Sequence, residues 1–353
     1  MDEVVAVLPV VPWTLAAVAT VLILALGVPP GGPRPATVRS AGSPVAGRVA
    51  AALALLAAVL IVVVTRVGPD GELDNPVPAL VVGLGWPLLL LLPGLAGLLR
   101  RRPDSPSPEA ARGDVRPALL TALAVLGYLT IPVAPTRPAA VGTAVAGYAV
   151  VIVAACVAFG RRAVAERFEV LGLLARWSAL GRALPRWAAP RGALAVLAVL
   201  LGGAWFERYE RTTAWTSGLP ARGATILGLA GALALAGLAA GALHLATRRG
   251  GAPGTAAAVL LPLAVATAVA GVARRALISA QLLANQAVGP RLIDPDPLGI
   301  PGGQALVLGL VVLGAGCAAA VLARRMGEET ARLPGMAVLL ALTGVSAWLV
   351  LQT

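Results

Sequence analysis

Charged residues are scarce in this chain, and that scarcity excludes most soluble folds. Only 12% of the 353 residues are charged and 58% are hydrophobic, whereas soluble domains carry about 25% charged residues. The apolar residues form continuous runs, and many runs reach the roughly 20 residues that cross a bilayer core. A membrane β-barrel would instead alternate polar and apolar residues in short strands. The composition therefore predicts an all-α fold, a polytopic transmembrane helix bundle.

Lysine is absent, so all 28 basic residues are arginines, against 16 acidic residues. A net charge of +12 often indicates a nucleic-acid partner, but these arginines fall mainly in the loops between apolar runs. Nucleic acid is therefore excluded as a partner, and the lipid bilayer is the expected environment. The predicted location is the cell (plasma) membrane, with several passes through it.

Histidine and cysteine are also rare: His244 is the single histidine, and Cys156 and Cys317 are the two cysteines. Neither cysteine lies in a CxxC pattern, so no disulfide framework or thiolate metal site is indicated. The hydrolase motifs GxSxG and HExxH and the phosphate-binding P-loop are missing as well. The sequence therefore predicts no catalytic residue, no cofactor and no bound transition metal. Elemental analysis that finds near one Zn, Cu or Fe per chain would contradict the prediction about metal.

Ten apolar spans are expected, five on each side of an arginine-rich segment. They cover residues 4–28, 49–65, 77–99, 117–134, 139–160, 192–206, 223–247, 255–273 or somewhat beyond, 303–323 and 334–352. The first begins MDEVV, without the cationic start of a secretory signal, so we interpret it as a retained helix. The sixth is short, which makes the preceding segment a candidate for its first turn. The chain thus divides into an N-terminal half (1–160), a linker (161–191) and a C-terminal half (192–353).

The linker is the longest stretch without a clean span, and it reads RRAVAERFEVLGLLARWSALGRALPRWAAPR. Its charges do not form one stripe. Glu166, Glu169 and Arg176 share a helical face, whereas Arg167 and Arg182 do not. A pair of surface helices whose arginines reach the membrane interface explains this pattern. The alternative is a docking site for a cytoplasmic protein partner.

The arginines alternate between the loops. The first, third, fifth, seventh and ninth loops hold 20 of them, and the other four loops hold 6. Cytoplasmic loops carry an excess of positive residues. The linker is therefore predicted to face the cytoplasm, and both termini are predicted to be extracytoplasmic.

Arg274 and Arg275 interrupt an apolar run. At 1.5 Å per residue they lie about 30 Å from the start of their span, at the outer edge of the hydrocarbon. They are either interfacial anchors or a cationic lining for an anion or a headgroup. Because adjacent helical residues diverge by about 100°, one of the two should turn inward, pair with an outer acid and close a vestibule between spans 3 and 8. The candidate acids are Glu207, Glu210, Asp294 and Asp296.

His244 lies near the inner end of its span. Gly237 and Gly241 share its helical face, and small residues mark close helix packing in membranes, so we expect His244 to point into the bundle. Ionisable groups inside a membrane are candidates for function, although a structural hydrogen bond also explains a single histidine. Asp294 and Asp296 complete the candidate substrate-binding set with Arg274, Arg275 and His244. The two aspartates also fit an ordinary turn in DPDPLG.

Several stretches resemble an uncharacterised family of actinobacterial and haloarchaeal polytopic membrane proteins, some members of which are labelled fenitrothion hydrolase. These stretches are GPDGELDNPVPALVVGLGWPLLLLLPG, AERFEVLGLLARWSALGR, GGAWFERYERTTAW, the block from Pro262 to Gln281, and LIDPDPLG. The resemblance implies a polytopic fold and, by that label, a hydrolase. Ala268, Gly271 and Cys317 stand where the family's histidines are expected. A function that depends on those histidines would be lost here.

Three classes of function follow from these patterns. Five spans on each side of the linker give oppositely oriented halves, as in inverted-repeat transporters. The proline-broken third span and its counterpart, with Pro262 and Arg274, would then line the site of a transporter or permease, which is the leading hypothesis. A membrane scaffold or assembly partner would instead use the linker and the small-residue faces. A membrane hydrolase rests on the resemblance alone.

The arginine alternation makes a prediction about topology. With cysteine introduced at Ser105 or at Ser217, a membrane-impermeant thiol reagent applied to intact cells should label position 217 and not position 105, because only the loop with few arginines faces outward. The reverse labelling pattern would contradict the predicted orientation.

Overall fold

The structure is a computed structural model, and it describes residues 44–71, 75–99, 113–130, 136–210, 222–248, 250–288, 298–327 and 329–351. Within these ranges each regular element is a helix. The first predicted span, residues 4–28, lies outside the described residues. Every other predicted span coincides with a helix, which confirms the all-α prediction for the described part of the chain.

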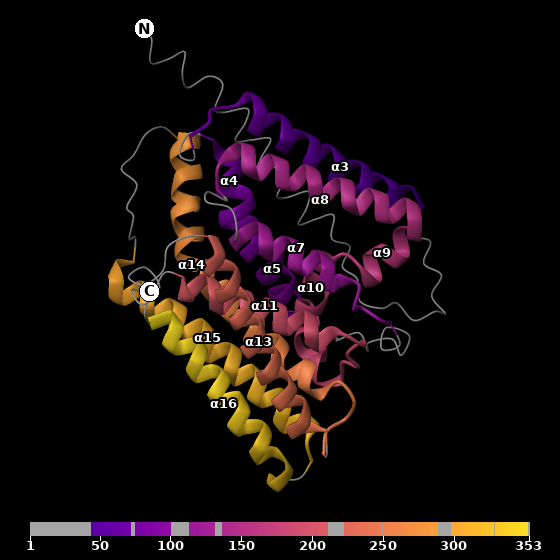
Figure 1. The fold of residues 1–353 in the computed structure, drawn as a ribbon, viewed down its shortest axis with the longest axis vertical. Helices are drawn as coiled ribbons and strands as arrows, with labels where there is room; N and C mark the ends of the chain where they lie inside the picture. The colour runs from indigo at the N-terminus through magenta and orange to yellow at the C-terminus, as the bar shows by residue number, and fades with distance from the viewer. Residues whose placement is uncertain are drawn as a thin grey trace.

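The helices follow the order expected from the apolar runs (Figure 1). The N-terminal half contains α3 (Pro44–Val67), the continuous segments α4 (Pro76–Pro78), η1 (Ala79–Gly85) and α5 (Trp86–Leu99), then α7 (Ala118–Thr130) and α8 (Pro138–Phe159). The linker contains α9 (Arg161–Arg167), α10 (Val170–Ser178) and the 3₁₀ helix η2 (Gly181–Arg186). The C-terminal half contains α11 (Ala193–Tyr209), α13 (Arg222–Thr247), α14 (Thr255–Val288), α15 (Gly299–Arg325) and α16 (Glu329–Leu351).

Six segments of the described chain are long and apolar enough to cross a membrane: Pro76–Gly97, Pro138–Phe159, Thr225–Thr247, Thr255–Asn285, Gly302–Arg325 and Arg332–Leu349. Leu56–Val67 and Ala118–Thr130 are shorter apolar helices. A multi-pass membrane protein is the class that such helices fit. The total of ten spans stays a prediction.

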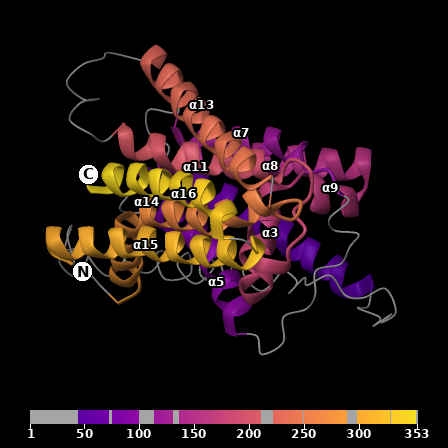
Figure 2. The same cartoon turned by 90° about the horizontal axis from the view of Figure 1, so that it is seen from below.

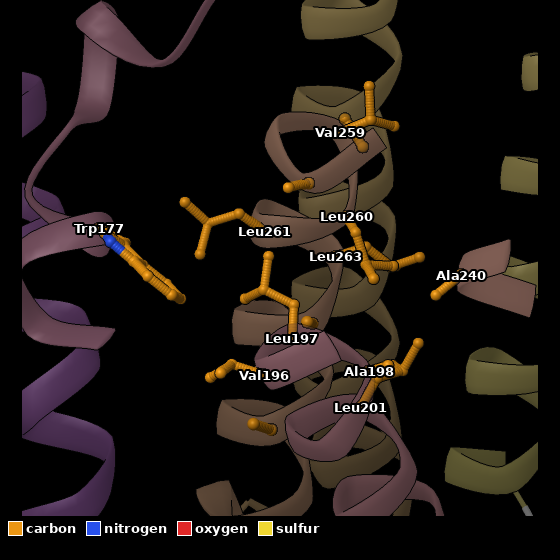
Figure 3. Close-up of a cluster of buried hydrophobic side chains, with 14 of the residues drawn as sticks. Trp177, Val196, Leu197, Ala198, Leu201, Ala240, Val259, Leu260, Leu261 and Leu263 are labelled. Carbon is orange, nitrogen blue, oxygen red and sulfur yellow. The ribbon is translucent and has the colours of Figure 1, made fainter. Parts of the chain in front are cut away.

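The helix α14 is the centre of the bundle. Its membrane-crossing window is 83% buried, whereas the windows of the other five candidate spans are 17–33% buried. It contacts α11, α13, α15, α16 and the span formed by α4, η1 and α5. Figure 2 shows it lying among α11, α15 and α16. Figure 3 shows Leu197 and Leu201 of α11 in one cluster of buried side chains with Val259, Leu260 and Leu263 of α14.

Small residues bring the helix axes close together. A methyl group on Gly314 of α15 would lie 2.9 Å from the Pro262 carbonyl oxygen and would overlap the Ala266 side chain of α14. A methyl group on Gly202 of α11 would lie 3.0 Å from the Ala232 carbonyl oxygen of α13. Such close contacts supply the dispersion attraction that holds helices together where lipid is as apolar as protein.

Two helix boundaries differ from the predicted spans. The α14 helix continues fifteen residues past Ala273, to Val288, because residues 274–288 contain no Gly or Pro. The sixth span takes no turn from the linker. It begins after Gly192, whose φ of 88° is a left-handed conformation that ends helical continuity, and it extends instead to Tyr209.

The third span carries a π-helical segment, η1, between α4 and α5. Pro87 is the second residue of α5, two residues after η1 ends. A proline lacks the N–H group that would bond the carbonyl four residues earlier, and its ring clashes with that carbonyl. Widening the helix to the π form relieves that clash, and π segments are often found at functional sites. Its residues contact α14.

Four loops that were predicted to share one side of the membrane meet at one end of the bundle. The backbone N–H of Val115 donates to the Arg191 carbonyl at 2.9 Å, which joins the third loop to the linker. Gly251 bridges Met326, and Gly254 packs against Ala189 of the linker. These contacts agree with a common side for the four loops, while the alternation of all loops across a membrane stays a prediction. We call this the linker end.

The packing of Gly314 predicts a stability difference between two alanine variants of α15. Gly314→Ala should destabilise the fold by about 1–3 kcal/mol, because overpacking forces α15 away from the α14 backbone. Gly316→Ala is the matched control, since no atom lies within 4 Å of its added methyl and alanine favours a helix. Thermal unfolding in detergent should show a lower midpoint for the first variant only. Equal midpoints would contradict the close α14–α15 contact.

Candidate functional site

A charged cluster lies where the end of α11 meets α14. Arg275 and Glu207 form an ion pair, with Nη2 of the arginine 3.6 Å from Oε1 of the glutamate. The two side chains are 33% and 22% exposed, so the pair is largely withdrawn from solvent. Arg274, next to it on α14, is exposed. The prediction that one arginine turns inward and pairs with an outer acid is therefore confirmed.

Arg208 completes the cluster, and it is buried with only 7% of its surface exposed. Its Nη2 donates a hydrogen bond to the Ala270 carbonyl oxygen at 2.6 Å. Gly271 lies against it: a methyl group there would make ordinary van der Waals contacts, 3.7 Å from Arg208 Nε and 3.8 Å from Glu207 Oε2. Both charged residues of α11 thus lie over one glycine of α14. Arg208 was not among the predicted site residues, although its place directly after Glu207 was a usable signal.

The cluster adjoins the π-helical segment. A methyl group on Gly83 of η1 would overlap the Ser279 hydroxyl group and would lie 3.8 Å from the Arg275 carbonyl oxygen. The third span therefore packs directly on α14 at this level. The vestibule expected between these two spans is filled by this contact, because glycine lets the two backbones approach. The ion pair lies beside that contact and does not line an opening between the spans there.

His244 does not join the cluster. It is exposed, and so are Gly237 and Gly241 on its face of α13. The expectation that it points into the bundle was wrong. The buried face of α13 carries Ala236, Ala240 and Leu243, which are 0–3% exposed. The glycine that allows close approach belongs to α11, at Gly202, and not to α13. His244 also lies near the linker end, whereas Arg275 lies twenty residues, or about 30 Å of helix, beyond Thr255.

Two further candidates, Asp294 and Asp296, lie outside the described residues. The positions at which the family's histidines were expected are separate from the cluster. Cys317 is exposed on α15, while Ala268 is 5% exposed within the core. Among the residues that the structure describes, no three His, Cys, Asp or Glu side chains gather into a set that could hold a metal ion. The prediction of no bound metal stays a prediction.

At the linker end, Glu169 organises the start of α10. Its carboxylate accepts hydrogen bonds from the backbone N–H groups of Leu171 at 2.9 Å and Gly172 at 2.6 Å, which satisfies two free donors of the first turn. The Tyr148 hydroxyl group of α8 donates to the same carboxylate at 2.5 Å. Burial lowers the pKa of Arg176 on α10, against the opposing effect of Glu169 and Glu166. The linker forms two short helices, α9 and α10, and α10 packs against α5, α7 and α14. Their place at a membrane surface stays a prediction.

Arg325, the last residue of α15, attaches the linker to the C-terminal half. Its guanidinium donates to the carbonyl oxygens of Pro185 at 2.9 Å and Leu184 at 3.4 Å, and also to that of Trp187. These carbonyls lie at the C-terminal end of η2, where helical carbonyls lack partners within the helix. Arg325 therefore acts as a helix cap supplied by another helix.

The ion pair predicts coupling between two conservative variants. Glu207→Gln and Arg275→Gln should each destabilise the protein, and the double variant should lose less than their sum, because each single change leaves one charge without its partner. The coupling should be about 1 kcal/mol, given that both groups keep some solvent contact. Chemical unfolding of all four proteins in detergent measures it. Additive losses would show that the pair does not interact.

Comparison with known proteins adds no further constraint: no family model, no curated protein and no solved structure matches this chain.

Proposed function

We propose that this chain is a membrane transporter or permease whose substrate contacts the charged cluster of Glu207, Arg208 and Arg275. The observation that carries the proposal is the placement of this cluster against the buried helix α14, beside a π-helical segment. Ionisable groups held within a helix bundle commonly mark the path of an ion or a polar solute. Helices that depart from the α form commonly mark the site itself.

The charges of the cluster favour an anionic substrate. Arg275 pairs with Glu207, and Arg208 follows Glu207 on α11 and binds the Ala270 carbonyl of α14. Arg274 adds a further, exposed positive charge next to Arg275. Guanidinium groups bind carboxylates and phosphates through paired hydrogen bonds. A small inorganic anion or a carboxylate is therefore the proposed class of substrate.

The packing of the two halves supports an inverted arrangement in part. In such an arrangement, α3 corresponds to α13 and α8 corresponds to α16. The helices α3 and α8 contact each other, and so do α13 and α16. The third span and its counterpart α14 also contact each other, as elements beside a two-fold axis would. The extensive contact of α14 with α15 has no comparable counterpart between the described parts of α5 and α7.

A membrane scaffold is the second candidate function. The close contacts of Gly83 with Ser279 and of Gly314 with Ala266 favour it, because helices packed this tightly leave no opening between them at those levels. The linker, held by Glu169 and Arg325, would then present the surface for assembly. The hydrolase activity implied by the family resemblance remains a third possibility, and no further observation supports it.

Charge movement across reconstituted membranes tests the transporter proposal. Liposomes containing the full chain are exposed to concentration jumps of phosphate, sulfate, acetate and succinate on a solid-supported membrane. At least one anion should give a current that exceeds the signal of protein-free liposomes. Arg275→Gln should raise the half-saturating concentration about tenfold, which corresponds to about 1.4 kcal/mol of binding free energy.

His244→Ala is the matched control, since His244 is exposed near the opposite end of the bundle. Its current should equal that of the unchanged protein. Currents indistinguishable from protein-free liposomes for all four anions would contradict the proposal of an anion transporter and make the scaffold the better candidate.

A further inference from the structure

Exposed arginines surround the last part of the linker, residues 181–191. This segment reads GRALPRWAAPR and contains three arginines and no acidic residue. Arg182, Arg186 and Arg191 are exposed, whereas Ala183, Leu184 and Trp187 are 3–8% exposed. The segment therefore buries its apolar side chains against the bundle and directs its arginines outward.

Neighbouring loops bring further arginines to the same place. Arg191 is bridged to Asp114, and Arg116 follows Asp114 in that loop. Arg325 binds the linker carbonyls around Arg186, which places the preceding residue, Arg324, nearby. We call the exposed arginines of this region the arginine face. They are Arg116, Arg182, Arg186, Arg191, Arg248 and Arg324.

Among the described residues of this face, Asp114 carries a negative charge. Its Oδ2 forms an ion pair with Nη2 of Arg116 at 2.6 Å. The hydrogen bond from the Arg116 side chain, together with that from its backbone and the charge of Arg191, lowers the pKa of Asp114 to about 2. The carboxylate is thus ionised at neutral pH, and it offsets one positive charge of the face. The face keeps an excess of positive charge.

The backbone beneath these arginines is well anchored. The N–H of Arg191 donates to the Gly113 carbonyl at 3.1 Å, and Gly254 packs on Ala189. The rings of Trp177 and Trp187 lie 5.4 Å apart beneath the segment, and both are buried. A ligand that binds the arginines therefore meets a backbone that is already ordered, which lowers the entropic cost of binding.

The arginine face also lies at the level where the membrane spans end. Candidate spans end at Phe159, Thr247 and Arg325, and another begins at Thr255. Phe159 is followed immediately by the linker, Arg325 binds it, and Thr247 and Thr255 flank the loop that packs on it. This is the depth of lipid headgroups and not of the hydrocarbon.

We propose that the arginine face binds the phosphate headgroups of anionic phospholipids. Guanidinium groups match phosphate oxygens in charge and in geometry, and clusters of basic residues beside membrane spans attract acidic lipids over about a Debye length. The bilayer supplies this partner at the required depth. The inference does not depend on the proposed transport function.

Lipid-dependent thermal stability tests this inference. The purified full chain in neutral detergent is mixed with phosphatidylglycerol or with phosphatidylcholine of the same chain length, and its unfolding temperature is recorded. Phosphatidylglycerol should raise the unfolding temperature more than phosphatidylcholine does, because a ligand that binds the folded state stabilises it. About 0.5 M NaCl should remove most of that difference, because salt screens charges at exposed sites.

Variants locate the effect. Arg182→Gln with Arg186→Gln should remove at least half of the difference between the two lipids. The control variant, Arg66→Gln with Arg137→Gln, removes two positive charges from the end of the bundle opposite the linker end. It should leave the difference between the two lipids unchanged. If the first pair fails to fold, Arg324→Gln on α15 replaces it, with a smaller loss expected.

Three outcomes would overturn the inference. The first is equal stabilisation by the two lipids. The second is a full response to phosphatidylglycerol in both Arg182→Gln/Arg186→Gln and Arg324→Gln. The third is an equal rise in unfolding temperature with inorganic phosphate alone, which would assign the face to a free anion and not to a lipid.

Discussion

Close approach of neighbouring helices to α14 is the constraint on which the rest of the structure depends. Lipid chains are as apolar as leucine, so burial of apolar surface does little to hold helices together inside a bilayer. Dispersion contacts must do so, and these require small residues. Gly314 on Pro262 and Ala266, and Gly83 on Ser279, are such contacts. They explain why the α14 window is 83% buried, while the windows of the other candidate spans are 17–33% buried.

The same close packing positions the charged cluster. Gly271 of α14 lies against Glu207 and Arg208 of α11, at distances that would leave room for a methyl group. Charged groups are costly inside a membrane unless they find partners, and here a carbonyl oxygen and an opposite charge supply them. The charged side chains of α11 therefore depend on partners that α14 supplies.

At the linker end, polar groups satisfy one another between distant parts of the chain. Glu169 receives two N–H groups of its own helix and the hydroxyl group of Tyr148, and Arg325 caps η2 from α15. These bonds join both halves to the linker, so the arginines that remain on its outer side share a common support. The two ends of the bundle thus differ in character: one holds charge between helices, and the other displays charge at the boundary of the membrane.

The sequence by itself determined the class of protein, the positions of most apolar helices, the common side of four loops and the inward turn of one arginine at 274–275. Each depends on local quantities, namely hydropathy, helix geometry and the spacing of charges. Only the tertiary structure decided which helix is central, that His244 faces outward, and that Arg208 joins Glu207. Helix faces toward lipid and toward protein are equally apolar, so hydropathy does not distinguish them. Both Gly202 and Gly241 would permit close packing, but a neighbouring helix packs against Gly202 and not against Gly241. The sequence does not show which glycine has such a neighbour.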